Sequence, residues 1–265
     1  MHACTILVAV LSLSLLCGAA QAKLVEGDVT YADGGTALRG FLVMDTAASG
    51  KRPAVIVFSD WKGLGEQAKD TARRLAALGL VAFAADMYGA GVLAADGKEA
   101  AALAKPFRDD RALMRRRAAA ALTVLAARPE VDPARIVAMG YCFGGTCALE
   151  LARSGAALAG TASFHGGLGT PNPADAKNVK GAVVAYHGAS DPNVPPPEVA
   201  AFEEEMTKAG VDWQLVAFGH AVHSFTNRSA GSDPGKGSAY NEKADKRSWE
   251  YFKVFLAETA GLTAP

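Results

Sequence analysis

The sequence predicts a doubly wound α/β fold: a mostly parallel β-sheet with helices on both faces and an antiparallel hairpin at its start. Apolar, β-rich runs alternate with amphipathic helical patterns through residues 23–265, as expected of parallel strands buried on both faces. The early segments DVTYADGG and ALRGFLVM flank an Asp-Gly-Gly turn, which is typical of a hairpin. No internal repeat or low-complexity linker divides these residues, so we expect one domain.

After the hairpin, the expected strands and helices alternate along the chain. The strand-like runs are AVIVFS, LVAFAADM, RIVAMGY, ALAGTASFH, GAVVAYHG and DWQLVAF. The helical patterns are GEQAKDTARRLAALG, a long region from Asp109 to Arg128, TCALELARSG, PEVAAFEEEMTKAG and a closing helix near KRSWEYFKVFLAE. Reactive residues of such sheets lie just beyond the carboxyl ends of the strands. The polar residues at those positions are Ser59, Asp60, Asp86, Cys142, His165, Asp191 and His223.

The composition is that of an ordinary globular protein. Of the 265 residues, 50% are hydrophobic and 20% are charged, and 27 basic side chains balance 27 acidic ones. A formal net charge of zero provides no long-range field to gather nucleic acid or anionic lipid. We therefore expect no nucleic-acid binding and no stable membrane association. We also expect a monomer or weak dimer.

Residues 1–22 are typical of a cleaved export signal. The apolar run TILVAVLSLSLL has 12 residues, too few to span a bilayer. Ala20-Gln21-Ala22 follows it and matches the small-x-small pattern that signal peptidase cuts. We expect cleavage near Ala22 and a periplasmic or secreted protein, although the N-terminal region has only His2 and the terminal amine as its basic groups. The alternative is a buried N-terminal helix.

Cys142 lies in GYCFGG, which is the Gly-x-Cys-x-Gly form of a nucleophile elbow. It follows a strand-like run and opens a helix, the context that this motif requires. Flanking glycines relieve crowding at a strained turn, and a helix N-terminus lowers the cost of a thiolate. Taken alone, the pattern favours the alternative, a small buried residue in a glycine-rich turn.

Cys147 is the other cysteine of the expected mature chain. It lies five residues after Cys142 in the same predicted helix, so the two thiols point to different faces. We expect a packed, inert thiol at Cys147. This spacing argues against a thiol-redox protein.

Asp191 and His223 each follow a later strand-like run and complete a candidate triad with Cys142. Asp191 lies in HGASDPNVPP, and His223 lies in GHAVHSF. The order nucleophile, acid, histidine is the one expected on this kind of sheet. Taken singly, Asp191 fits an Asx-turn or helix cap ahead of Pro195, and a lone loop histidine is usually structural.

Five segments together resemble the dienelactone hydrolase family across essentially all of residues 23–265: GYCFGG, SFHGGL, HGASDPNVP, HSFTN and ADMYG. The resemblance implies an α/β-hydrolase fold, a Cys–His–Asp triad, and no metal or organic cofactor. It makes Cys142 the nucleophile, His223 the general base and then acid, and Asp191 the residue that orients His223. His220 competes for the role of base, but His223 has the Ser-Phe that follows the family's histidine.

Asp60 stands where the family usually has a glutamate whose carboxylate contacts the resting thiol. Although Asp60 is one methylene shorter, we expect it to face Cys142 and restrain its ionisation. The alternative is that Asp60 caps the helix near Gly65 or bonds nearby backbone. We expect the backbone N–H groups of Trp61 and Phe143 to form the oxyanion hole.

The positions that bind substrate in the family are a second place where this sequence departs from the family's pattern. Two arginines that hold a substrate carboxylate in the best-known members correspond here to Ala90 and Asn227, with Arg228 one place later. The side chains expected to line the pocket are Tyr88, His165, Phe225 and Arg228.

The expected function is hydrolysis of activated carboxylic esters or lactones, which are small molecules, through a thioester acyl-enzyme. A thiolate is a better leaving group than an ordinary alkoxide, because its parent thiol has a pKa of about 8.5. Enol lactones, aryl esters and thioesters should therefore be preferred. The alternative is a non-catalytic small-molecule-binding protein on the same scaffold, which Asp60 and the missing arginines keep open.

Overall fold

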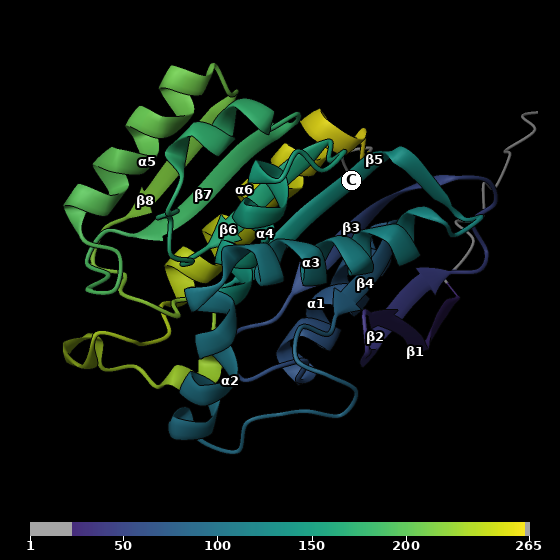
Figure 1. Cartoon of the computed structure of the whole chain (residues 1–265), viewed down its shortest axis with the longest axis horizontal. Coiled ribbons are helices and arrows are strands. Elements are labelled where there is room, and N and C mark those ends of the chain that lie inside the picture. The colour runs from purple at the N-terminus through teal and green to yellow at the C-terminus, as the bar shows by residue number, and fades with distance from the viewer. Residues whose placement is uncertain (1–22, 263–265) are drawn as a thin grey trace, which may run out of the picture.

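The computed structural model describes residues 23–262, and the expected signal segment, residues 1–22, lies outside them. The eight strands form one sheet in the order β1-β2-β4-β3-β5-β6-β7-β8 (Figure 1). Their bounds are β1 Leu24–Asp33, β2 Thr36–Asp45, β3 Arg52–Phe58, β4 Val81–Ala85, β5 Val131–Tyr141, β6 Gly160–Phe164, β7 Ala182–Gly188 and β8 Trp213–Phe218.

Strand direction confirms the predicted mixture of an antiparallel start and a parallel remainder. β1 and β2 pair antiparallel around the turn at Gly34, whose φ of 58° is left-handed and suits glycine. β2 also runs antiparallel to β4, and every later neighbour in the sheet is parallel. The carboxyl ends of the parallel strands therefore share one edge, where the loops carrying the candidate residues meet.

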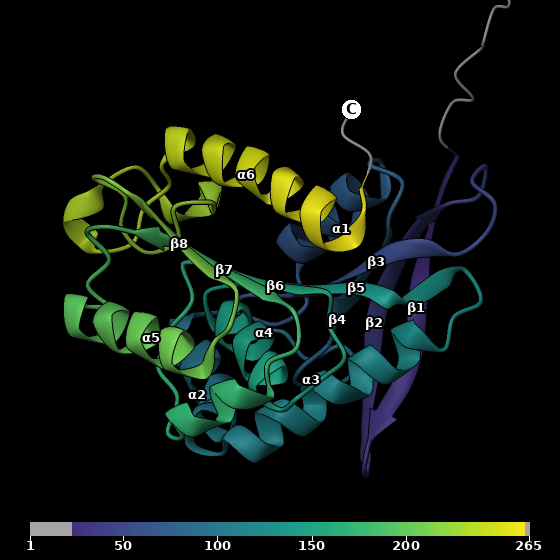
Figure 2. The same cartoon turned by 90° about the horizontal axis from the view of Figure 1, so that it is seen from above.

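Helices cover both faces of the sheet, as Figure 2 shows. α1 (Glu66–Ala76) and α6 (Glu242–Ala260) lie on one face. The other face carries α2 (Gly97–Asp109), α3 (Arg111–Ala126), α4 (Phe143–Arg153) and α5 (Pro196–Ala209). None of the helices within residues 23–262 has the length and apolarity of a membrane span.

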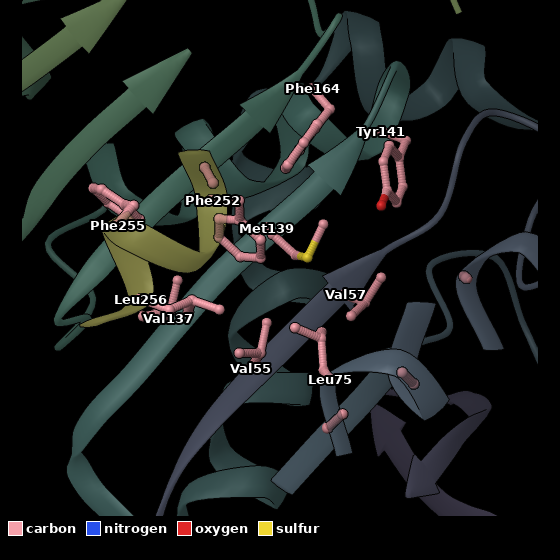
Figure 3. Close-up of a cluster of buried hydrophobic side chains, with 14 of the residues drawn as sticks. Val55, Val57, Leu75, Val137, Met139, Tyr141, Phe164, Phe252, Phe255 and Leu256 are labelled. Carbon is pink, nitrogen blue, oxygen red and sulfur yellow. The ribbon is translucent and has the colours of Figure 1, made fainter. Parts of the chain in front are cut away.

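Alternate residues of the central strands are buried in two separate hydrophobic cores, one on each face of the sheet. Val55 and Val57 of β3 point to the α1/α6 face, where Leu75 of α1 lies beside them and Phe252 of α6 packs on the neighbouring strands (Figure 3). Ile56, between them in β3, points to the opposite core beneath α3 and α4. Because strand side chains alternate between faces, a run that is apolar at every position can bury both.

The long helical region predicted from Asp109 to Arg128 corresponds to α3, which is two residues shorter at each end, and the helix before it, α2, was not predicted. Two helices meet there: α2 ends at Asp109 and α3 begins at Arg111. Asp110 between them has extended backbone, and its side chain accepts the N–H of Leu113 as an N-cap. The cap starts a new helix axis and leaves Asp109 and Arg111 flanking a bend.

Candidate active site

Cys142 sits at the tight turn between β5 and α4 with a φ of 53°, which is unusual for a residue with a side chain. Its N–H donates to the carbonyl of Phe164 at the end of β6, at 3.0 Å. Its own carbonyl accepts the N–H groups of Gly145 and Thr146 in the first turn of α4. These bonds hold a strained backbone in place, and the side chain projects beyond the edge of the sheet.

The glycines around Cys142 are required by close backbone approach. A Cβ on Gly140 would lie 2.1 Å from the carbonyl oxygen of Gly144, and one on Gly144 would lie 2.3 Å from the carbonyl oxygen of Phe58. These neighbours are backbone atoms, which cannot turn aside as a flexible side chain does. The glycines therefore allow α4 to begin directly against β3 and β5.

Cys142, His223 and Asp191 are brought into a single chain of contacts. His223 Nε2 lies 3.0 Å from Cys142 Sγ, and His223 Nδ1 lies 2.8 Å from Asp191 Oδ2. A carboxylate only accepts hydrogen bonds, so Nδ1 donates to Asp191 and Nε2 faces the sulfur. The Asp191 side chain is fully buried, and that of His223 is 13% exposed.

Backbone contacts hold the acid and the histidine in position. Asp191 follows β7 and uses its second oxygen, Oδ1, to accept the N–H of Asn193 at 2.8 Å. The Asx-turn that the sequence allowed is therefore present together with the contact to His223. His223 is fixed through its own backbone, which pairs with Gly237 and Ala239 of the following loop.

Burial alone would lower the pKa of His223, because it disfavours the imidazolium. Hydrogen bonds to Asp191 and Cys142, together with the charges of both groups, outweigh burial and raise the pKa of His223 to about 10. At neutral pH the imidazole is therefore positively charged and lies against the sulfur.

These side chains open into a cavity of about 660 Å³. Trp61 and Phe143 line it, and their backbone N–H groups form no hydrogen bond with any group in residues 23–262. Two unpaired N–H groups beside a nucleophile are suited to a developing oxyanion. The remaining polar lining includes Gln67, Thr146, Asn193, Ser224, Asn227 and Ser238.

Of the four side chains expected to line the pocket, the structure places only His165 in the cavity wall. It is buried, its Nε2 is 2.8 Å from Thr226 Oγ1, and its ring packs edge-on against that of His223. Burial first, and then the charge of His223, hold the pKa of His165 well below its usual value, so it is neutral.

The other three expected lining residues lie elsewhere. Phe225 is fully buried in the core, where its ring packs against those of Phe218 and His165. Tyr88 lies behind the cavity wall, where its hydroxyl donates to the carbonyl of Trp61 at 2.9 Å. Arg228 lies over the ring of Tyr240 and lines an adjoining hollow.

Asp60 lines the cavity but forms no hydrogen bond with Cys142. Its Oδ1 accepts the N–H of Lys62 at 2.9 Å, as the nearby-backbone alternative anticipated, and α1, whose N-cap is Gly65, has no side-chain cap. Burial raises the pKa of Asp60, and the Lys62 N–H and the charges of Lys62 and His223 oppose that rise. The Asp60 carboxylate is therefore electrostatically coupled to His223.

The remaining candidates from the sequence either make structural contacts or lie outside the cavity. Asp86 is buried and accepts the backbone N–H groups of Arg39, Tyr88 and Gly89. Cys147 is buried, burial raises the pKa of its thiol, and neither it nor Cys142 forms a disulfide. His220 is exposed and lies outside the cavity wall.

Sequence reasoning missed the two arginines that line the cavity, Arg108 and Arg111. They flank the bend at Asp110, between α3 and a helix, α2, that was not predicted. An Asp before a helical run is an N-cap signal, and recognising it would have placed both arginines beside a loop. Within the described part of the chain, no His, Cys, Asp and Glu side chains converge in a way that could hold a metal ion.

Comparison with known proteins agrees with the fold described above. Residues 38–260 match the dienelactone hydrolase family. The solved structure of a dienelactone hydrolase-like promiscuous phosphotriesterase from metagenomic libraries is 42% identical, with a TM-score of 0.86 over 90% of this chain and 99% of that protein. The solved structure named m3DLH is 41% identical, with a TM-score of 0.86 over 89% and 99% of the two chains.

A sequence relative from Synechocystis sp. is named as a carboxymethylenebutenolidase. It is 26% identical over 241 residues, which cover 85% of this chain and 93% of the relative. The similarity therefore extends across nearly all of both chains.

The pKa of His223 provides a direct test of the contacts described above. We expect its imidazole to titrate near pH 10 in the wild type, as followed by NMR of the ring nitrogens. In Asp191→Asn the charged acceptor of Nδ1–H is lost, so the imidazolium is less stabilised and the pKa must fall. A His223 that titrates near 6.5 in the wild type would contradict the assignment.

Proposed function

The chain belongs to the dienelactone hydrolase family, and from that premise we propose that it hydrolyses activated carboxylic esters or lactones with Cys142, His223 and Asp191. The observation that carries the proposal is the chain of contacts from Asp191 through His223 to the sulfur of Cys142. A charged imidazole against a thiol favours the thiolate, which is the nucleophilic form.

In the first half of the proposed reaction, Cys142 Sγ attacks the carbonyl carbon of the substrate. The carbonyl oxygen becomes an oxyanion, which the N–H groups of Trp61 and Phe143 stabilise. The tetrahedral intermediate then expels the alcohol oxygen, which takes the proton from His223 Nε2. The product of this half is a thioester between the acyl group and Cys142, with a neutral His223.

In the second half, neutral His223 accepts a proton from water while the water oxygen attacks the thioester carbonyl. The carbon–sulfur bond breaks, the acid is released, and the thiolate returns beside the imidazolium. Asp191 retains its negative charge throughout and orients His223 through Nδ1. His223 thus regains from water the proton that it gave to the alcohol, and the reaction needs no reactant other than the ester and water.

Leaving-group chemistry defines the substrate class. In the tetrahedral intermediate the thiolate competes with the alcohol oxygen for departure, and the less basic group leaves first. Simple alkyl esters would mostly return to substrate, whereas aryl esters, enol lactones and thioesters would react forward. A phosphotriester belongs in the test panel because the metagenomic relative described above is a promiscuous phosphotriesterase.

The deciding experiment is this panel of esters, lactones and a phosphotriester, run on wild type and Cys142→Ala with and without iodoacetamide. We expect aryl-ester and enol-lactone turnover that alkylation and Cys142→Ala both abolish. A folded wild type that binds these compounds without hydrolysing them would favour the alternative, a small-molecule-binding protein.

The two loop histidines supply a matched pair of variants. We expect His223→Ala to reduce turnover of an aryl ester at least about a hundredfold, because both proton transfers are lost. His220→Ala should have little effect, since His220 is exposed and outside the cavity wall. Steady-state kinetics on both variants measures the difference, and the reverse order would show that the wrong histidine has been assigned.

We propose that Asp60 restrains ionisation of Cys142 through its charge, since both line the same cavity without a hydrogen bond between them. In Asp60→Asn we expect the rate of alkylation by iodoacetamide, measured across pH, to rise at lower pH than in the wild type. Inactivation by peroxide should also be faster, because oxidation follows thiolate character. Exposed Asp212→Asn is the control, and identical pH profiles for all three proteins would refute this role.

We also propose that the protein is exported and cut after Ala22, on the basis of the apolar run and the Ala-Gln-Ala sequence. Intact mass of protein from the native host should correspond to a chain that begins at Lys23. A chain that retains Met1 in the cytoplasm would refute export.

A further inference from the structure

The solvent-facing side of α6 carries two large apolar side chains. Tyr251 and Val254 are 48% and 56% exposed, whereas Phe252 between them is fully buried against the sheet. Arg247 lies one turn before Tyr251 and Glu258 lies one turn after Val254, and both are exposed. Residues at positions i, i+4, i+7 and i+11 lie on one face of a helix. Arg247, Tyr251, Val254 and Glu258 therefore form one line of side chains, the α6 stripe.

The two charges at the ends of the α6 stripe have no partner in their own chain. Among residues 23–262, no ion pair and no side-chain hydrogen bond includes Arg247 or Glu258. Lys246, beside Arg247, is by contrast paired with Glu242 at 2.7 Å. The α6 stripe thus has one free positive end, an apolar centre and one free negative end.

The α6 stripe borders the β8 edge of the sheet. The ring of Tyr251 stacks on that of Phe218 at the end of β8, with the ring centres 6.4 Å apart and the planes inclined by 11°. β8 is the last strand of the sheet, and its sequence WQLVAF contains neither a charged residue nor a proline. β1, at the other edge, carries Glu26 and Asp28. Charged residues on an edge strand oppose association between sheet edges, and β8 lacks that protection.

The order of residues makes the α6 stripe complementary to itself. Arg247 and Glu258 are centred on the same point of α6 as Tyr251 and Val254. When two copies of α6 run antiparallel about a twofold axis through that point, each Arg247 faces the partner's Glu258. Each Tyr251 then faces the partner's Val254. Opposite charges and apolar groups therefore meet in pairs, as an isologous interface requires.

We propose that the α6 stripe is the interface of a homodimer, formed by antiparallel packing of two α6 helices about a twofold axis. The occupant is a second copy of this chain, because the pattern of charged and apolar groups matches its own reverse. A partner in this position also lies beside β8 and shields its edge. No residue of the α6 stripe lines the catalytic cavity, so the inference is independent of the proposed function.

Sedimentation velocity over a range of protein concentrations tests the proposal. We expect the wild type to show a monomer–dimer equilibrium with a Kd on the order of 10 μM, since one helix pair is a small interface. Arg247→Glu and Glu258→Arg each replace two attractive contacts with two repulsive ones, so each should raise Kd at least about tenfold. The double variant Arg247→Glu/Glu258→Arg exchanges the two charges and should restore the Kd of the wild type.

Lys98→Glu is the matched control. Lys98 is exposed on α2, which covers the opposite face of the sheet (Figure 2), and its reversal changes the net charge as Arg247→Glu does. Its Kd should equal that of the wild type. Val254→Lys places a charge at the apolar centre of the interface and should raise Kd at least about tenfold without altering the charges at either end.

Circular dichroism and the melting temperature of each variant, measured at a concentration where the wild type is monomeric, show whether the fold is kept. We expect all variants to match the wild type there, because the substituted side chains are exposed. A wild type that stays monomeric at every concentration would overturn the proposal. So would single reversals that leave the dimer intact, a double variant that does not regain it, or an equal loss in Lys98→Glu.

Discussion

The active-site architecture depends on one backbone constraint, the left-handed conformation of Cys142 at the junction of β5 and α4. A residue with a side chain adopts a φ of 53° only when its surroundings enforce it. Here the enforcing contacts are the bond from its N–H to Phe164 and the close approach of Gly140 and Gly144. The turn lifts the sulfur above the sheet edge, where loops from two later strands can reach it.

Electrostatics at the site follow from that placement. The sulfur lies against His223, whose other nitrogen is held by buried Asp191. Burial alone would favour the neutral imidazole. The hydrogen bonds to Asp191 and Cys142 favour the protonated form and outweigh burial. Neutral His165 packs edge-on against the same ring and adds no competing charge. One positive group thus lies between two acceptors, as the proposed proton transfers at His223 require.

The cavity wall depends on a helix cap. Asp110 ends one helix axis and begins the next, and this bend brings Arg108 and Arg111 to the same cavity as Cys142. In a continuous helix, positions 108 and 111 would also lie on one face, but the helix axis would not bend between them. Part of the cavity wall therefore comes from a helix junction, whereas Cys142, Asp191 and His223 come from loops at strand ends.

The sequence by itself determined the strand–helix alternation, the hairpin, and the order of Cys142, Asp191 and His223, because periodicity, turn residues and motif spacing are local properties of the chain. It also indicated the need for glycines at the elbow. Tertiary structure alone decided that Phe225 is buried in the core and that Tyr88 lies behind the cavity wall against Trp61. Those outcomes depend on which surfaces long-range packing brings together, and no local pattern records that.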